Sequence, residues 1–391
     1  MATDIRQIAE DDRRRYVEIC NYAFGGTLEE TEWSLSISPL EDSWGLYVDG
    51  DLMSCLRIFP FRLRIAGAVL RAGGIANVAT APEGRGHGYA HRLMHQAIRG
   101  MRDRREPVSV LYPFSYGYYG RLGWALASER RVYRMPPACL RTAPEARDII
   151  RFGAEDDIAA LQSIYEPMGQ RYSCMLERDE AHWRKLVLRP KRLAFLERAG
   201  ASPRAYLILR EVIAPETGER HIWVYEWAAL NAPGRRALLE FLGLHYSQVK
   251  QVTMAAPADD SLWDYVADRD ITAQIEPGFM FRVVDLEQAV RGRAYRADLE
   301  ATLHLHVVDP MAEWNSATWS IAIRNGSADV EASTGNADLR CDITAFSQIF
   351  CGYLLPSDAY FLGRLEAPKP DALEIADEVF RAPRTFMWDI F

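Results

Sequence analysis

A glycine-rich run between an apolar segment and a helix-like segment constrains this chain more than any other stretch. The run "EGRGHG" covers residues 83–88, with "IANVAT" (75–80) before it and "AHRLMHQAI" (90–98) after it. A strand, turn and helix in this order leave the first N–H groups of the helix without backbone partners, at the positive end of the helix dipole. Glycines let an anion approach the backbone closely, and Arg85 adds a fixed positive charge. The stretch therefore predicts an anion site, for which pyrophosphate is a natural ligand.

Two common phosphate loops do not fit this run. A P-loop requires Gly-x-x-x-x-Gly-Lys-Ser/Thr, which is absent from the stretch. A dinucleotide fold requires Gly-x-Gly-x-x-Gly, but the position of the third glycine is occupied by Tyr89. A glycine-rich turn that binds nothing remains an alternative at this point.

A weak internal repeat predicts two copies of one domain. "IRQIAEDDRRRYVEIC" (5–20) aligns with "IRFGAEDDIAALQSIY" (150–165), and both are typical of a short strand followed by a helix. A second pair follows in the same order. The strand, turn and helix around the glycine run correspond to "VYEWAALNAPGRRALLEFLG" (224–243), which has the same plan without the glycine run. We therefore expect a second domain that has lost the anion loop.

Two changes of pattern divide the chain further. The proline-rich stretch 133–147 is typical of a linker, and the pattern changes again near 281–284. Beyond it, "TWSIAIRNGSADVEAS" alternates around Asn325–Gly326, which predicts a β-hairpin, and "TAFSQIFCGYL" (344–354) predicts an apolar helix. We expect domains at 1–140, 141–284 and 285–391.

The loop resembles that of a known superfamily. Arg85-x-x-Gly88-x-Ala90, preceded by "VATAP" (78–82), is similar to the pyrophosphate loop of the GNAT acetyl-CoA-dependent N-acetyltransferases. The stretch "VSVLYPFSYGYYGRLGW" (108–124) resembles one branch, the enhanced intracellular survival (Eis-like) acetyltransferases. This resemblance implies an α/β (α+β) fold of two tandem GNAT domains, with mixed twisted sheets flanked by helices. It also implies a C-terminal domain like sterol carrier proteins, acetyl-CoA as co-substrate and a homohexamer.

The resemblance also implies residue roles. It assigns the coenzyme to the following residues: Val78, Ala79, Thr80, Arg85, Gly86, His87, Gly88, Tyr89, Ala90, His91, Phe114 and Ser115. The catalytic acid would be Tyr119, with Tyr112, Tyr116 and Tyr118 as neighbouring alternatives. The base would be the main-chain carboxylate of Phe391, at the end of "RTFMWDIF". An internal carboxylate such as Glu29 or Glu32, or water, is the alternative base.

Charge and composition bear on the acceptor. Eight acidic residues and no lysine or arginine lie between Tyr16 and Leu56, so we expect a cationic acceptor with a primary amine: a polyamine, an aminoglycoside or a lysine side chain. Trp33, Trp44 and the acids near Glu29–Asp42 are expected to line its pocket. The net charge of −8 argues against nucleic-acid binding.

Other features favour a cytoplasmic enzyme without metal. The N-terminus is too charged for a signal peptide, and no apolar run reaches 18 residues, so we expect no membrane partner. The six scattered cysteines are typical of buried, reduced thiols. His87, His91 and His95 share one helix face, but we expect no metal there. The alternatives to an enzyme are a lipid-binding carrier-type protein and a non-catalytic acyl-CoA sensor.

Overall fold

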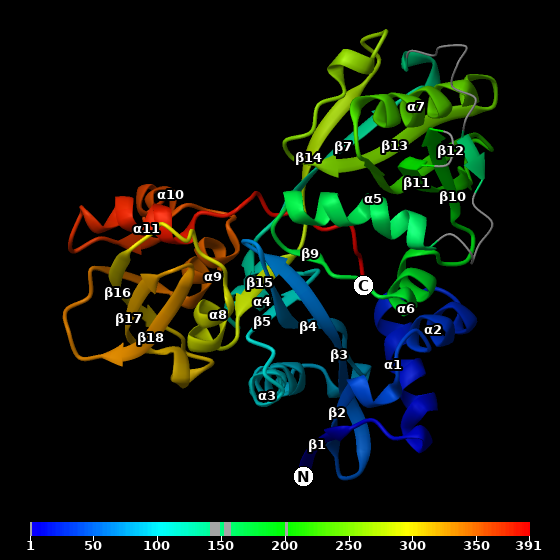
Figure 1. Ribbon diagram of the computed structural model, residues 1–391. Helices are drawn as coiled ribbons and strands as arrows, with labels where there is room; N and C mark the ends of the chain where they lie inside the picture. The colour runs from blue at the N-terminus through cyan, green and yellow to red at the C-terminus, as the bar shows by residue number, and fades with distance from the viewer. Residues whose placement is uncertain (1, 141–148, 152–157, 200–201) are drawn as a thin grey trace. The chain divides into compact units, whose positions relative to one another are not determined.

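The computed structural model describes residues 2–140, 149–151, 158–199 and 202–391. The chain forms two compact units (Figure 1). Unit 1 comprises Met1–Ala127, Phe279–Thr385 and the single residue Phe391, and unit 2 comprises Ser128–Gly278 and Phe386–Ile390. The expected boundary at 140/141 borders residues 141–148, which are outside the described residues, as is the central part (152–157) of the second repeat copy.

Unit 1 contains a mixed sheet with helices on both faces. Its strands, in spatial order, are β1 (Thr3–Gln7), β2 (Ser43–Val48), β3 (Asp51–Ile65), β4 (Ala68–Thr80), β5 (Val108–Leu111), β15 (Met280–Val283) and β6 (Ala125–Leu126). Its helices are α1 (Arg13–Phe24), α2 (Leu28–Leu35), α3 (Tyr89–Asp103) and α4 (Tyr116–Gly120). Cys55 packs with the buried residues of α1 and its neighbour Leu56 with those of α3, because successive side chains along β3 point to opposite faces of the sheet. Figure 1 shows these two helices and the sheet.

Strands β4 and β5 separate partway along their length. They pair in parallel from Ala72↔Val108 to Ile75↔Leu111, and β4 then continues to Thr80. A bulge interrupts the β3–β4 register at the same point, where Asn77 has a φ of +53°. No strand of the described chain pairs with residues 76–80 on the β5 side. The backbone N–H and C=O groups of this segment therefore form an open edge.

The sheets do not follow the linear domain boundaries. β15, which falls inside 141–284, lies between β5 and β6 of the first sheet. β7 (Glu129–Met135), which falls inside 1–140, pairs with strands of the second sheet. The predicted linker was therefore wrong for residues 133–135, which end β7. Pro136 and Pro137 stand directly after this strand, where their missing N–H groups interrupt no ladder.

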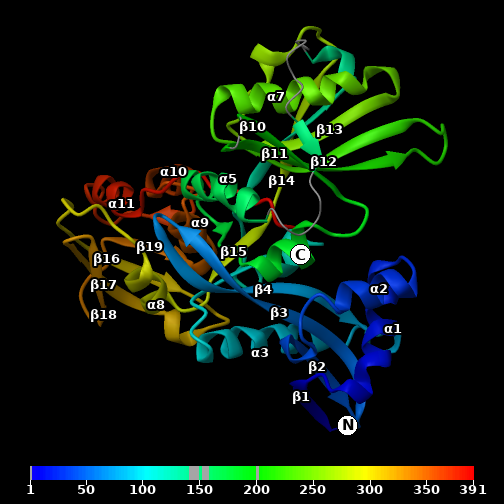
Figure 2. The same ribbon diagram turned by 45° about the vertical axis from the view of Figure 1, so that its right-hand side comes forward.

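Unit 2 repeats the plan of the first sheet. Its strands, in spatial order, are β14 (Thr272–Pro277), β7, β13 (Val249–Pro257), β12 (Arg220–Ala229), β11 (Ser202–Ile213), β10 (Leu193–Ala199) and β8 (Ile149–Arg151). α5 (Ile158–Arg171) and α7 (Ala232–Gly243) cover opposite faces of this sheet (Figure 2). Shorter elements are β9 (Met175–Leu176) and α6 (Glu180–His182). The strand and helix predicted for each repeat copy are confirmed as β1 with α1 and β8 with α5.

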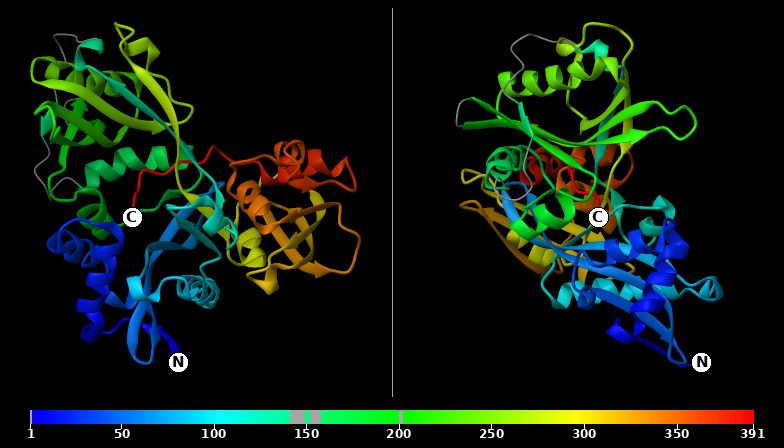
Figure 3. Two further views of the ribbon diagram at one scale, coloured as in Figure 1. Left: turned by 180° about the vertical axis from the view of Figure 1, so that it is seen from behind. Right: turned by 90° about the vertical axis from the view of Figure 1, so that its right-hand side faces the viewer.

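The C-terminal part of unit 1 consists of a second sheet and a layer of helices. Its strands, in spatial order, are β18 (Ser327–Ser333), β17 (Ala317–Arg324), β16 (Ala301–Val308), β19 (Leu339–Asp342) and β20 (Leu365–Glu366). Its helices are α8 (Leu286–Gly292), α9 (Ile343–Cys351), α10 (Pro356–Phe361) and α11 (Ala372–Phe380), most of which gather beside one face of the sheet (Figure 3). The hairpin is confirmed: β17 and β18 meet at Asn325 and Gly326, which both have positive φ.

Candidate active site

The glycine run forms an open turn at the start of α3. Gly86 and Gly88 have φ values of +81° and +73°, which side-chain-bearing residues rarely adopt. A Cβ atom added at either glycine would meet no atom within 4 Å. Gly88 is the N-cap of α3 and supplies no side-chain cap, and the first backbone bond into the helix runs from Arg92 N–H to Gly88 C=O. The helix start therefore presents free N–H groups in open space, as an anion site requires.

Arg85 and His87 are exposed, and the side chains of this turn contact one another and the end of α1. The Arg85 guanidinium lies 5.3 Å from the ring centroid of Tyr22, at the end of α1. The His87 Nδ1 atom lies 3.0 Å from the Arg85 carbonyl oxygen, and the His87 ring stacks on that of Tyr89 with centroids 5.3 Å apart. His91 is also exposed, and Ala90 is half-buried. The charged and polar groups of the turn thus remain available to a ligand.

The open edge of β4 leads up to this turn. Ser54 on β3 donates its hydroxyl to the Ala79 carbonyl (2.9 Å), and its oxygen lies 3.0 Å from Thr80 Oγ1. These contacts hold the end of β4 to β3, while the opposite edge stays free between Val78 and Thr80. A linear amide chain can add there as an extra strand.

An aromatic group follows β5. Phe114 is 71% exposed, whereas Tyr119 is 3% exposed, and their ring centroids are 5.2 Å apart. Ser115 caps α4 by accepting a hydrogen bond from the Tyr118 N–H. Burial, and then the neighbouring Tyr118, raise the pKa of Tyr119 above its ordinary value near 10, so its hydroxyl stays protonated at neutral pH. Tyr119 therefore carries a proton that it can donate at neutral pH.

The alternative tyrosines differ from Tyr119 in their surroundings. Tyr116 is 47% exposed, and Tyr112 lies beside the ring of Phe391. The Tyr118 hydroxyl is buried and has no hydrogen-bond partner among the residues that the structure describes. Tyr118 is therefore the competitor that any test of Tyr119 must include.

The terminal residue packs in unit 1. The ring of Phe391 contacts the rings of Phe59 and Phe61 on β3, with centroids 6.0 and 4.8 Å apart, and that of Tyr112 just beyond β5, 5.7 Å away. All three contacts are edge-to-face, the geometry that aromatic quadrupoles prefer. The Phe391 side chain thus packs against β3 and against the residue that follows β5, the two strands that flank β4.

The segment α1–α2 is acidic, aromatic and exposed. Its exposed members include Tyr22, Phe24, Leu28, Glu29, Glu30, Glu32 and Trp33. Thr27 and Glu30 form a capping box that starts α2, and the buried Arg57 donates to the carbonyl of Leu35 at its end (2.8 Å). Burial raises the pKa of Asp42, which follows this segment. Trp44 is half-buried and packs against the core that contains the buried residues of α3.

Sequence reasoning missed three contributors to this region: Asn77, Tyr22 and Arg57. Asparagine tolerates positive φ, but nothing in the strand pattern marks Asn77 as the position of the bulge. The contact of Tyr22 with Arg85 and the bond of Arg57 to α2 both join residues far apart in the sequence. Only the tertiary structure brings these pairs together.

The corresponding helix of unit 2 begins differently. α7 has Asn231 as its N-cap, whose side chain accepts a hydrogen bond from the Gly234 N–H (2.9 Å), and a proline stands in its first turn. Cβ at Gly234 would lie 3.0 Å from the Arg204 carbonyl oxygen. This helix start is closed by its own side chain and by neighbouring backbone, so it lacks the open anion site of α3.

Other candidate sites are less developed. The described residues contain no cluster of three His, Cys, Asp or Glu side chains that could hold a metal ion. Burial lowers the pKa of His95, aided by Arg99 and His91. All six cysteines are buried and none of them is part of a disulfide. Among the described helices, none has the length and apolar character needed to cross a membrane.

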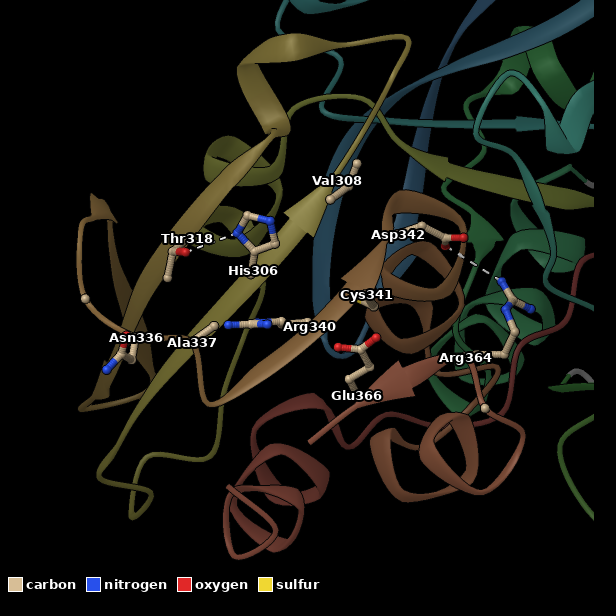
Figure 4. A pocket seen from close by; sticks show the side chains of 12 residues that line it. His306, Val308, Thr318, Asn336, Ala337, Arg340, Cys341, Asp342, Arg364 and Glu366 are labelled. Carbon is tan, nitrogen blue, oxygen red and sulfur yellow. Dashed lines mark hydrogen bonds and ion pairs between the residues drawn. The ribbon is translucent and has the colours of Figure 1, made fainter. Parts of the chain in front are cut away.

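A cavity of about 540 Å³ lies in the C-terminal part of unit 1 (Figure 4). Much of its lining is polar or charged: His306 bonded to Thr318, Arg340, Asp342, Arg364 and Glu366. The apolar helix predicted at 344–354 corresponds to α9, whose side chains are almost all buried. Its Ser347 accepts from the Val283 N–H, and its Phe350 ring stacks on Phe281 of β15. The helix is therefore core, and the cavity lining suits a polar ligand better than a lipid chain.

Comparison with known proteins agrees with this architecture. Residues 4–127 and residues 174–283 each match a model of an acetyltransferase (GNAT) domain, and residues 286–388 match a sterol carrier protein domain. An uncharacterized N-acetyltransferase of Streptomyces avermitilis is 23% identical over 97% of both chains, and one of Streptomyces griseus is 22% identical over 98% of both. The chain is therefore an N-acetyltransferase of the GNAT type.

Solved structures extend the likeness in fold to the whole chain. A GCN5-related N-acetyltransferase from Anabaena variabilis has a TM-score of 0.90 at 23% identity, with both chains fully covered. Eis1 from Mycobacterium abscessus has a TM-score of 0.79 at 21% identity, again with both chains fully covered. The chain thus contains two GNAT domains followed by a sterol-carrier-like domain, and it shares its fold with Eis1 over its whole length.

Proposed function

We propose that the protein transfers an acetyl group from acetyl-CoA to a primary amine of a cationic acceptor, by direct attack of the amine on the thioester. One observation carries the proposal: the uncapped start of α3, with open glycines at 86 and 88, lies directly after the free edge of β4. The first feature suits a pyrophosphate and the second suits the amide chain of pantetheine. Residues 1–140, the first of the three expected domains, would then hold the coenzyme.

The coenzyme would contact both sides of the gap between β4 and β5. The N–H groups of Gly86–His91 and the charge of Arg85 would hold the pyrophosphate. The backbone of Val78–Thr80 would pair with the pantetheine arm, and an N–H there would polarise the thioester carbonyl. Phe114 and Ser115 would border the opposite side, because they follow β5.

Proton transfer requires an acid and a base. We assign the acid to Tyr119, whose raised pKa keeps it protonated, and which would donate to the departing thiolate. We assign the base to the α-carboxylate of Phe391, which would accept a proton from the ammonium group of the acceptor and so free the neutral amine to attack the thioester. The aromatic seat of Phe391 supports this assignment, because a base must be held in one place to act.

The acidic and aromatic surface of α1–α2 supports a cationic acceptor. Carboxylates attract a polyamine or aminoglycoside at long range, and exposed rings such as Tyr22 and Trp33 stack on ammonium groups. The test is a panel of amines, with acetyl-CoA as donor and thiol release as readout. Cationic amines should be turned over, and the rate should fall with added salt. Turnover of anionic amines alone would refute the cationic acceptor.

Two further expectations of the family resemblance are part of this proposal: assembly as a homohexamer and residence in the cytoplasm. Analytical ultracentrifugation tests the first. The thiol-release assay with the panel of amines also separates the alternative functions, because an acyl-CoA sensor would bind acetyl-CoA without releasing thiol for any amine. A lipid carrier would bind a fluorescent fatty acid, which the charged lining of the C-terminal cavity does not favour.

A further inference from the structure

Arg57 on β3 is a fully buried cation that donates to two neutral oxygens. Its Nη2 atom donates to the carbonyl of Leu35, the last residue of α2, at 2.8 Å, and its Nε atom donates to Ser43 Oγ at 3.0 Å. Its Nη1 atom has no hydrogen-bond partner among the residues that the structure describes. The end of a helix carries unpaired carbonyls and partial negative charge, which a cation stabilises. Burying a guanidinium is nevertheless costly, so this placement points to a role beyond packing.

A chain of hydrogen bonds leads from Arg57 to the bulge of β4. The Ser43 hydroxyl, which accepts from Arg57, donates to the hydroxyl oxygen of Tyr16 on α1 (3.3 Å). The side-chain amide of Asn77 donates to the same oxygen, at 3.5 Å, the longest link of the chain. Ser43 and Tyr16 are both fully buried, and burial raises the pKa of Tyr16, so its hydroxyl stays neutral. Buried polar groups linked in this way fix one another's orientation.

The chain ends at the residue that shapes the open edge of β4. Asn77 has a φ of +53° at the bulge, a conformation that persists only when its surroundings hold it. The Cys55 thiol, 3.9 Å from the Asn77 carbonyl oxygen, adds a second contact. Val78, the next residue, begins the segment that we propose to pair with the pantetheine arm. The conformation of Asn77 therefore sets the direction of the N–H groups in that segment.

We propose that Arg57 is a positioning residue for acetyl transfer, because it holds the end of α2 directly and the bulge of β4 through Ser43 and Tyr16. The inference rests on the proposed function, in which α1–α2 receives the cationic acceptor and Val78–Thr80 receives the thioester. All of these groups belong to unit 1. One guanidinium then fixes the amine side and the thioester side of the site in relation to each other. The rate of transfer depends steeply on that relation.

The test compares Tyr16→Phe with a matched control, Tyr47→Phe. Tyr47 is 2% exposed and belongs to the same core, but its hydroxyl donates to Asp12 (2.8 Å), outside the chain of bonds. Each variant loses one hydroxyl, so the two melting temperatures should fall by similar amounts. For Tyr16→Phe we expect kcat about tenfold lower and KM for the amine within about twofold, because the bond from Arg57 to α2 remains. For Tyr47→Phe we expect both constants near wild type.

A second readout requires no amine. When an N–H polarises the thioester carbonyl, the infrared stretch of that carbonyl moves to lower frequency, which can be followed in bound acetyl-CoA labelled with carbon-13 at the acetyl carbonyl. This shift should be smaller than in wild type in Tyr16→Phe and in Asn77→Gly, and unchanged in Tyr47→Phe. Glycine adopts positive φ readily but lacks the amide, so Asn77→Gly tests the hydrogen bond separately from the backbone conformation.

A third variant tests the bond to α2. Arg57→Lys keeps the charge, but its single ammonium group cannot reproduce the fork that reaches both Leu35 and Ser43, so kcat should fall and KM for the amine should rise at least about fivefold. Wild-type kcat and carbonyl frequency in folded Tyr16→Phe and Asn77→Gly would overturn the positioning role and leave the proposed function intact. A wild-type protein that binds acetyl-CoA but releases thiol with none of the amines in the panel would instead refute the proposed function, and with it this inference.

Discussion

The rings of Phe391 and Phe61 lie with their centroids 4.8 Å apart and their planes at 72°. The side chain of Phe391 therefore packs against β3 through an aromatic contact. If the α-carboxylate of Phe391 is the base, any residue added after it moves the charge by about 3.3–3.6 Å. A displacement of even 1 Å can cost about a hundredfold in rate.

We therefore expect a Gly-Ser extension after Phe391 to lower kcat at least about a hundredfold, with acetyl-CoA affinity and melting temperature unchanged. The measurements are thiol release, calorimetry and thermal denaturation, with the terminus confirmed by mass spectrometry. The control is the same dipeptide at the N-terminus. Full activity of the extended protein would return the role of base to Glu29, Glu32 or water.

Tyr119→Phe should lower kcat by a factor of about 10²–10⁴, because it removes the proposed acid and keeps the ring. Tyr118→Phe, the neighbouring change, should leave kcat within a few-fold of wild type. Since burial raises the pKa of Tyr119 above about 10, the pH–rate profile of the wild type should show no loss of this acid below pH ~10. A larger effect of Tyr118→Phe would exchange the two roles.

Gly88→Ala should weaken acetyl-CoA binding at least tenfold. The φ of +73° makes alanine strained there by about 1–2 kcal/mol, and the methyl group would occupy the open space before α3. Gly218→Ala is a matched control, since Gly218 has a φ of +68° and open surroundings in a turn of unit 2. It should cost similar stability and leave calorimetric affinity unchanged. Equal losses of affinity in both variants would contradict the site.

Acetyl-CoA should bind with a stoichiometry of one per chain. The helix start of α3 is open, whereas that of α7 is closed by the Asn231 cap and a proline. Asn231→Ala should lower stability by about 1 kcal/mol through the lost cap, and create no second site. Titration calorimetry of both proteins gives the stoichiometry directly, and two equivalent sites would refute the assignment.

Asp389 should contribute to stability in a pH-dependent way. Burial alone would raise the pKa of Asp389, but the charges and hydrogen bonds of Arg178 and His182 hold it below that of an unfolded chain, where aspartate titrates near pH ~3.9. The contribution is therefore present above that value and is lost as the pH falls towards the folded-state pKa. The difference in free energy of unfolding between wild type and Asp389→Asn, from urea titrations, should shrink as the pH is lowered from 5 to 3. A constant difference would show that the carboxylate is not held by charge.

Local patterns predicted the parts of this fold that depend on local rules. The glycine run before α3 and the hairpin at Asn325–Gly326 follow from backbone geometry, and the repeat of β1 with α1 follows from shared residues. The sequence did not predict that β7 pairs in the second sheet and β15 in the first, because the residue pattern of a strand does not show which sheet the strand joins. The pair of Arg178 and Asp389 was missed for a related reason. A buried ion pair between distant residues leaves no periodic signal in the sequence.

The position of β15 has a consequence for synthesis. All four residues of β5 are buried, and β15 pairs along one edge of that strand from Val283↔Val108 to Met280↔Leu111. A ribosome completes the chain from the N-terminus, so residues 128–279 emerge before β15 can reach its place. The N-terminal domain, although made first, is therefore closed late, and during that interval β5 presents an unpaired edge that can join other chains. A fragment ending at Ala127 keeps this edge permanently and should aggregate during translation.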